Sequence, residues 1–211
     1  MKKRSVVEML VLAVVMAIAL GILAGAYFVT VGVSARPKPG RIEMLASQTV
    51  RGIAIRTRVR GLTNPVPASA EVIAEGRDHF ADHCAVCHGN DGSGDTEMGR
   101  GLYPRAPDMR LPATQNLSDA ELFYIIENGV RLTGMPGWTT GTKEGETSSW
   151  HLVHFIRHLP KLTAEEIEHM ESMNPKSPEE IRQEIEAEKF LQGGDVTPSE
   201  STTHEHAGAH K

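Results

Sequence analysis

Cysteine is scarce in this chain, and its scarcity limits the kinds of site that the thiols can form. Only two of the 211 residues are cysteines, and both lie in Cys84-Ala85-Val86-Cys87-His88. No further thiol is left for a structural disulfide, so a fold held together by several disulfides is excluded. This one motif accounts for the whole thiol content of the protein.

Two sites that a Cys-x-x-Cys pair can form lack their usual surroundings here. A redox disulfide of the thioredoxin type expects a βαβ pattern around the cysteines, and none is visible. A zinc ion needs four ligands, and Cys84, Cys87 and His88 supply three, so a distant histidine would have to complete the set. The chain also lacks any nucleic-acid-binding module. Its net charge of −5 is the sum of a basic and an acidic half, so it argues neither for nor against binding to nucleic acid.

The arrangement that remains is covalent attachment of a haem group. Two thiols at this spacing can each add across a haem vinyl group, and His88 then lies beneath the iron as an axial ligand. The preceding residues predict a helix over 69–81, in which Gly76 and Phe80 share one face, so that a second helix can approach closely at the glycine. The glycine-rich turn of residues 89–94 permits positive φ values directly after the histidine.

The pattern Gly-xxx-Phe-xxx-Cys-xx-Cys-His, followed by that turn, resembles the N-terminal helix of class I cytochromes c. The resemblance covers roughly residues 69–160. It implies an all-α domain with one covalently attached haem c, held by Cys84 and Cys87, with His88 as one axial ligand. It also implies a distal methionine in a Gly-Met-Pro-x-Trp setting just after a helix, which Met135 matches.

Met135 is therefore the predicted second axial ligand of the iron. A thioether is a soft ligand suited to haem iron, and His/Met ligation raises the reduction potential. Met98 and Met109 also follow the motif and are the competing methionines, and an open or histidine-filled position is the remaining alternative. A backbone carbonyl of Pro104 or Pro107 is expected to accept the N–H of the proximal imidazole.

The remainder of the haem domain is predicted to contain two more helices. Ser118 and Glu121 form a capping box for a helix that ends near residue 128. Ser148 is predicted to cap a last helix that runs to Leu159 and is stopped by Pro160.

An apolar run from Met9 to Val33 follows the basic residues Lys2, Lys3 and Arg4. At about 1.5 Å per residue, a helix of this length exceeds the roughly 30 Å hydrocarbon core of a bilayer. The basic N-terminus is expected to stay in the cytoplasm, which places the haem domain on the extracytoplasmic side of an uncleaved anchor. The alternative is a signal peptide cleaved near Ser34, but the run is longer than the usual apolar region of such peptides.

Two charged segments flank the predicted haem domain. From Arg36 to Arg60 the chain has seven Lys and Arg against one Glu, a net charge of +6, which suits anionic lipid headgroups. Helical spacing in this segment predicts a short amphipathic helix that includes Ile42, Leu45, Val50 and Ile53. From Ala164 to Asp195 the net charge is −7, and two helices broken at Asn174-Pro175 are expected there, as a solvated face or as a docking surface for a basic partner. The last residues are predicted to be disordered, with incidental metal affinity at His204, His206 and His210.

The sequence thus predicts five segments and one main function. The segments are an N-terminus with its membrane anchor (1–35), a basic connector (36–68), a cytochrome c haem domain (69–160), an acidic helical extension (161–192) and a disordered tail (193–211). The predicted function is a membrane-anchored mono-haem cytochrome c that carries electrons between respiratory protein partners and is not an enzyme by itself. The alternatives are a cytochrome subunit of a membrane dehydrogenase or oxidase complex, a haem sensor or peroxidase, and metal handling by the tail.

Overall fold

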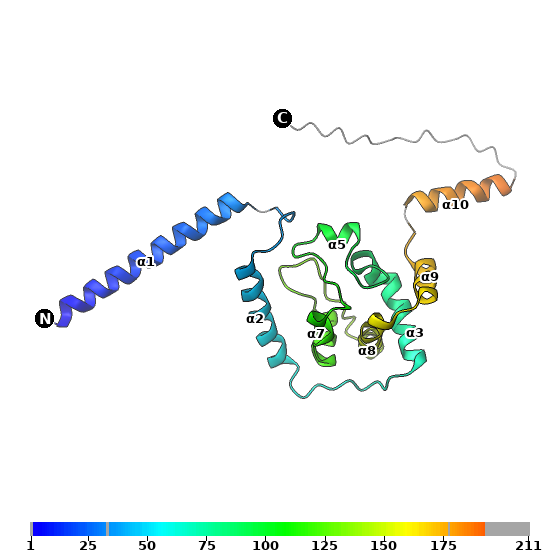
Figure 1. Ribbon diagram of the computed structural model, residues 1–211, viewed down its shortest axis with the longest axis horizontal. Coiled ribbons are helices and arrows are strands. Elements are labelled where there is room, and N and C mark those ends of the chain that lie inside the picture. The colour runs from blue at the N-terminus through cyan, green and yellow to red at the C-terminus, as the bar shows by residue number, and fades with distance from the viewer. Residues whose placement is uncertain (1, 33, 177, 193–211) are drawn as a thin grey trace. The chain divides into compact units, whose positions relative to one another are not determined.

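The computed structural model describes residues 2–32, 34–176 and 178–192, and each regular element within these ranges is helical (Figure 1). The chain divides into two compact units after Met173. The predicted all-α fold is confirmed. The tail predicted for residues 193–211, with its three histidines, lies outside the described residues.

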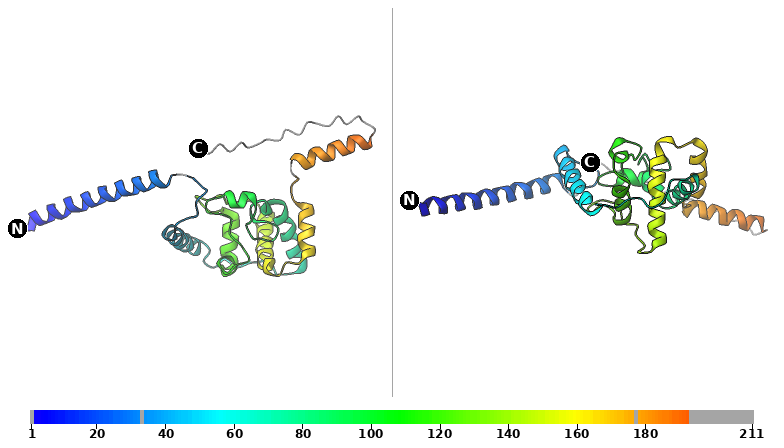
Figure 2. Two further views of the ribbon diagram at one scale, coloured as in Figure 1. Left: turned by 45° about the horizontal axis from the view of Figure 1, so that its top comes forward. Right: turned by 90° about the horizontal axis from the view of Figure 1, so that it is seen from below.

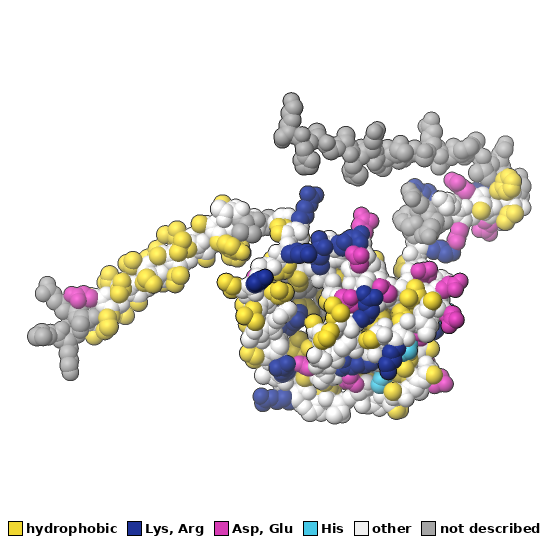
Figure 3. All heavy atoms as spheres, in the orientation of Figure 1, with side chains coloured by type: hydrophobic (Ala, Val, Ile, Leu, Met, Phe, Trp, Pro, Cys, Tyr) yellow, Lys and Arg dark blue, Asp and Glu magenta, His cyan; other side chains and the backbone are white. Residues whose placement is uncertain are grey.

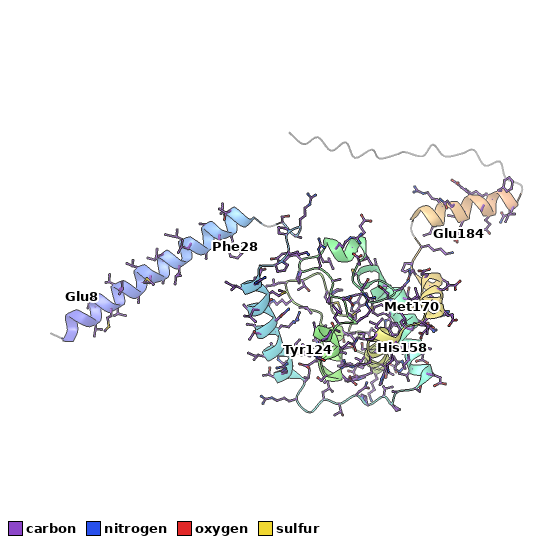
Figure 4. The ribbon with its side chains drawn as sticks, in the orientation of Figure 1. Glu8, Phe28, Tyr124, His158, Met170 and Glu184 are labelled. Carbon is purple, nitrogen blue, oxygen red and sulfur yellow. The ribbon has the colours of Figure 1, made fainter. Side chains whose placement is uncertain are left out.

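The N-terminal helix α1 spans Lys2–Val31, and within it Val6–Thr30 is long and apolar enough to cross a membrane. Its described side chains are exposed and almost all apolar, as Figure 3 shows. Figure 4 places Glu8 near one end of the helix and Phe28 near the other, so the single acidic residue lies outside the central turns. The predicted N-terminal apolar helix is confirmed.

The haem-motif domain is assembled from short helices that follow one another closely. In chain order they are α3 (Ala70–His79), the π-helical turn η1 (Phe80–Cys84), α4 (Ala85–His88), α5 (Glu97–Gly101), α6 (Pro112–Gln115), α7 (Asp119–Asn128), α8 (Lys143–His158) and the 3₁₀ turn η2 (Leu159–Lys161). Ser69 caps α3, and Ser118 with Glu121 forms the predicted capping box of α7. Gly129 ends α7 with a φ of 66°.

The crossing of α3 and α8 forms the centre of the domain. A Cβ atom on Gly76 would lie 2.2 Å from the backbone oxygen of His151 and 3.0 Å from the Cβ of Phe155, so only glycine permits this approach. Phe80 and Phe155 are fully buried beside the crossing, with ring centroids 5.1 Å apart. The close helix approach predicted at Gly76 is confirmed.

Helix α8 begins earlier than predicted. Thr142 is its N-cap and accepts a hydrogen bond from Gly145 N–H at 3.1 Å, so the prediction of Ser148 as the cap is wrong. Ser148 lies inside the helix and donates to the carbonyl of Glu144. The neighbouring Ser149 is buried and donates a hydrogen bond to Glu127 of α7 at 2.5 Å.

Helix α9 (Ala164–Met173) packs on the domain although the sequence assigns it to the acidic extension. It contacts α3 and η1, beside which it lies in Figure 2. Met170 is completely buried in the core cluster that also contains Phe155 and Leu159. Hydrogen bonds join His158 Nε2 to Glu166 at 2.9 Å and His169 Nε2 to Asp78 at 3.1 Å. The second unit contains α10 (Pro178–Leu191), so the two predicted C-terminal helices are present.

The predicted amphipathic helix of the basic segment is α2 (Arg41–Arg58). Its buried residues are Ile55 and, just past its end, Val59, which pack with Ala120, Tyr124 and Ile125 of α7. Figure 4 shows Tyr124 on the α7 helix. The four apolar residues named from the sequence lie elsewhere on the helix surface and are all exposed.

Candidate functional site

The Cys-x-x-Cys-His motif lies on a tight turn between α3 and the glycine-rich loop. The N–H of Ala85 donates to the carbonyl of Phe80, which is the π-helical bond that closes η1. Cys84 ends this π turn, while Cys87 and His88 belong to the single turn of α4. Gly89, Gly92 and Gly94 then take the predicted positive φ values of 71–72°.

Both thiols are free and protonated in this environment. Burial, together with the nearby Cys87, raises the pKa of Cys84 to about 12, and burial also raises the pKa of Cys87. A protonated, buried thiol is a poor redox nucleophile. The described ranges contain no strand, so the βαβ setting of a redox disulfide is not found in them. They also contain no group of three or more His, Cys, Asp or Glu side chains arranged to hold a metal ion, so the zinc alternative gains no support.

His88 is held as a neutral imidazole. Burial lowers its pKa, and the backbone carbonyl of Pro107 opposes this shift. Nδ1 is buried, yet no hydrogen bond of ordinary geometry reaches it. A neutral imidazole is the form that binds a metal ion, and a proton on Nδ1 toward Pro107 leaves the lone pair of Nε2 for a ligand.

The loop that carries Pro107 is fixed against the glycine-rich turn. A Cβ on Gly94 would lie 2.4 Å from the carbonyl oxygen of Ala106 and 3.0 Å from that of Pro107. The N–H of Met109 donates to the carbonyl of Gly92 at 2.8 Å. The proline carbonyl predicted to face the imidazole is therefore that of Pro107, and its place depends on glycines in the turn.

Helix α5 and its N-cap Thr96 pack against the other side of the motif, a contact that was not predicted from the sequence. Thr96 Oγ1 donates to the carbonyls of Val86 and Cys87 at 2.8 and 3.1 Å, and accepts from Gly99 N–H at 2.9 Å. A Cβ on Gly99 would lie 2.2 Å from the carbonyl oxygen of Cys87. The available signal was the threonine three residues before a glycine, the spacing of a helix N-cap.

Met135 lies in the loop that leaves α7. The N–H of Val130 donates to the carbonyl of Met135 at 3.0 Å, and Met135 N–H donates to Thr133 Oγ1 at 3.1 Å. Gly129 lies under this loop, because a Cβ there would be 2.5 Å from the Met135 oxygen. The backbone of the predicted ligand is therefore fixed, while its side chain is half-buried.

Two contacts connect the Met135 loop to the haem motif. Trp138 makes an edge-on ring contact with His83, the neighbour of Cys84, at a centroid distance of 5.5 Å. Gly134 packs on the side chain of Leu102, which directly follows α5. The methionine loop therefore contacts the residue before Cys84 through Trp138, and the residue after α5 through Gly134.

The competing methionines occupy different environments. Met98 is exposed on α5, while Met109 is buried in the main apolar core. Of the residues near the proline-rich loop, Arg105 is exposed, and Tyr103 donates a hydrogen bond to Glu43 at 2.6 Å. This hydrogen bond raises the pKa of Tyr103 to about 12.

Comparisons with known proteins agree with this geometry. Residues 71–156 match the family described as cytochrome C oxidase, cbb3-type, subunit III. Over 105 residues the chain is 34% identical to the cbb3-type cytochrome c oxidase subunit FixP of Rhizobium etli and 32% identical to subunit FixPc of Rhizobium leguminosarum bv. viciae. Each alignment covers 48% of this chain but only 32% of the relative, so the chain spans about a third of the curated relatives it matches. The helices around Cys84-Ala85-Val86-Cys87-His88 form a c-type cytochrome domain.

Proposed function

We propose that this chain is a membrane-anchored mono-haem cytochrome c that carries single electrons. Cys84 and Cys87 would hold one haem c covalently, and His88 and Met135 would bind its iron. The observation that carries this proposal is the half-buried His88 on the motif turn, whose pKa burial lowers, with the methionine loop in contact with the same turn through Trp138. When bound, the haem supplies one-electron oxidation and reduction.

The surrounding residues have separate roles in this proposal. The two thiols fix the group covalently, so it is not lost during repeated transfer. The Pro107 carbonyl orients the imidazole and raises its basicity as a ligand. The buried core that includes Phe80 and Ile126 keeps water away and lowers the local dielectric, which helps to set the potential. His88 and Met135 would both stay bound to the iron in either oxidation state, so little of the chain would have to rearrange.

The membrane anchor belongs to the same proposal. Helix α1 crosses the membrane once, and the basic residues 2–4 keep its start on the cytoplasmic side, with the haem domain outside. The electron partners are respiratory proteins at that face.

A second candidate is a permanent cytochrome subunit of a membrane oxidase. The family match and the two FixP-type relatives favour it, since all three are described as oxidase subunits. Purification of the native protein in mild detergent separates the candidates: a fixed subunit migrates with oxidase partners at constant stoichiometry, while a carrier separates from them.

The first test is the oxidised visible spectrum of the full chain, expressed with the c-type maturation machinery. A weak far-red methionine-to-iron band, with haem that resists acid-acetone extraction, supports the attachment and the Met135 ligand. Covalent haem without this band contradicts Met135 ligation and favours a sensor or peroxidase. A chain that binds no haem contradicts the proposal as a whole.

A further inference from the structure

Helix α2 exposes an apolar face that points away from the domain on which it packs. Ile42 and Ile53 are 86% and 62% exposed, and Val50 is similarly exposed. At about 100° per residue, these three lie within an arc of about 80° on the side opposite Ile55. In Figure 3, apolar and basic side chains lie next to one another over α2. Three large apolar side chains on one exposed face form a patch that is typical of contact with a membrane or with another protein.

Contacts with the domain fix the direction of this face. Ile55 and Val59 are buried against α7, so α2 cannot turn its outward side inward without losing that contact. Arg56 forms an ion pair with Glu121 at 3.1 Å. Glu43, near the start of α2, accepts the hydrogen bond of the Tyr103 hydroxyl. The outward face is therefore a fixed surface of the haem domain.

The positive charge around α2 indicates which kind of surface its apolar face binds. The segment from Arg36 to Arg60 carries a net charge of +6. Arg58 and Arg51 are exposed, about 80° and 100° around the helix from Val50, on the way to the Ile55 side. Helices with an apolar face and flanking basic residues lie in the plane of a membrane interface, where their cations meet anionic headgroups.

The connection to α1 keeps α2 near the membrane. Only residues 32–40 separate the end of α1 from the start of α2. Nine residues span at most about 32 Å when fully extended. If α1 crosses the bilayer, as the proposed function states, α2 begins within that distance of the bilayer surface.

We propose that α2 is an interfacial helix that seats the haem domain on the membrane. The face with Ile42, Val50 and Ile53 enters the headgroup region, and the exposed Arg51 and Arg58 reach from the side of the helix toward anionic lipid. Because α2 is fixed to α7, this contact sets the orientation of the haem domain relative to the bilayer. The domain then exchanges electrons from one defined orientation and does not move freely on a tether. This inference rests on the α1 anchor of the proposed function.

The test measures the depth of a spin label on the haem-loaded full chain in lipid vesicles. Ile42→Cys and Ile53→Cys place the label on the outward face. Ser172→Cys, on the exposed surface of α9, is the matched control. The native cysteines are consumed by haem attachment, so each variant has one reactive thiol. Oxygen, which concentrates in the bilayer, and a water-soluble nickel chelate each relax the label by collision.

The expected result is an oxygen-to-nickel relaxation ratio severalfold higher at positions 42 and 53 than at 172. The ratio should fall in vesicles of zwitterionic lipid alone and in the variant R51Q/R58Q. Labels at 42 and 53 that are as open to nickel as the label at 172 overturn the proposal. Labels shielded from both reagents also overturn it, because they show a protein on this face. Flotation with the vesicles is measured in parallel: a chain that does not float contradicts the α1 anchor as well, whereas a floating chain with nickel-accessible labels contradicts only the role of α2.

Discussion

The most specific predictions concern single residues at the candidate site, and the first tests Met135 as an iron ligand. Met135→Ala should abolish the far-red band and lower the reduction potential by on the order of 0.1 V or more, because a soft sulfur ligand favours ferrous iron. Redox titration with visible spectroscopy measures both effects. Met98→Ala is the control, since Met98 is exposed on α5. Equal spectra and potentials for both variants would contradict Met135 as the ligand.

Gly76 supports a second prediction at this scale. Gly76→Ala should lower the free energy of unfolding by about 1–3 kcal/mol, because its Cβ would overlap the backbone of His151 on α8. Gly52→Ala is the matched helical control: no atom lies within 4 Å of its Cβ, so it should stabilise the chain by up to about 1 kcal/mol. Urea unfolding of the haem-loaded chains gives both values. A Gly76→Ala chain as stable as the Gly52→Ala chain would show that the two helices separate without cost.

At the scale of elements, local signals predicted the helices better than their ends and faces. The capping box of α7 and the glycine at the α3–α8 crossing are local features, and the structure contains both. The start of α8 was wrong because both Thr142 and Ser148 suit an N-cap and only tertiary packing decides between them. The buried face of α2 depends on α7, which lies more than 60 residues away.

In the candidate site, too, local features were readable from the sequence and packing contacts were not. Attachment through Cys84, Cys87 and His88 and ligation by Met135 remain predictions, and the motif itself is readable because its residue types and spacing are local. The π turn before Cys84 and the contacts of Thr96 and Gly99 with the motif were not predicted. Both depend on how separate helices pack together, and helical periodicity carries no signal for that.

Helix α9 yields a prediction about pH. Although burial raises the pKa of Glu166, hydrogen bonds from Thr163 and the charge of His158 outweigh it and lower the pKa below its ordinary value of 4.5. A lowered carboxyl pKa stabilises the folded state above pH 4.5, and this contribution is lost as the pH falls below 4.5 through the lowered value. The docking of α9 should therefore weaken at acid pH, by about 1 kcal/mol.

Hydrogen exchange of the α9 amides, corrected for the intrinsic pH dependence, measures this weakening. Protection should be lower at pH 3.5 than at pH 7. Glu166→Gln should lower protection already at pH 7 and reduce the further loss on acidification. Glu165→Gln, at an exposed neighbouring position, is the control and should behave like the native chain. Identical pH profiles for Glu166→Gln and the native chain would rule out this role of the carboxylate.

At the scale of the whole molecule, charge is arranged in order along the chain. A basic segment of +6 follows the apolar helix α1, the cytochrome domain comes next, and an acidic segment of −7 follows it. The net charge of −5 hides this separation. The positive end lies next to the proposed anchor, where anionic lipid is the nearest counter-charge, so the acidic helices α9 and α10 remain for solvent or for basic partners.

The haem domain as a whole should depend on its cofactor for folding. The main core contains thirteen buried residues, which is little apolar surface for a domain of about 90 residues. In the proposed holoprotein, the haem would add apolar surface to this small core. The chain with Cys84→Ala and Cys87→Ala, which cannot attach haem, should therefore lose its cooperative unfolding transition, while α1 stays helical in detergent.

Far-UV circular dichroism during thermal unfolding tests this dependence. Met135→Ala is the informative control, because it removes one proposed ligand but keeps both thioether bonds, and it should retain a cooperative transition. A haem-free chain with the same helix content and a transition as sharp as that of Met135→Ala would show that the side-chain core suffices alone. The haem would then bind to a domain that is already folded, whereas the small apolar core favours a domain whose folding the haem completes.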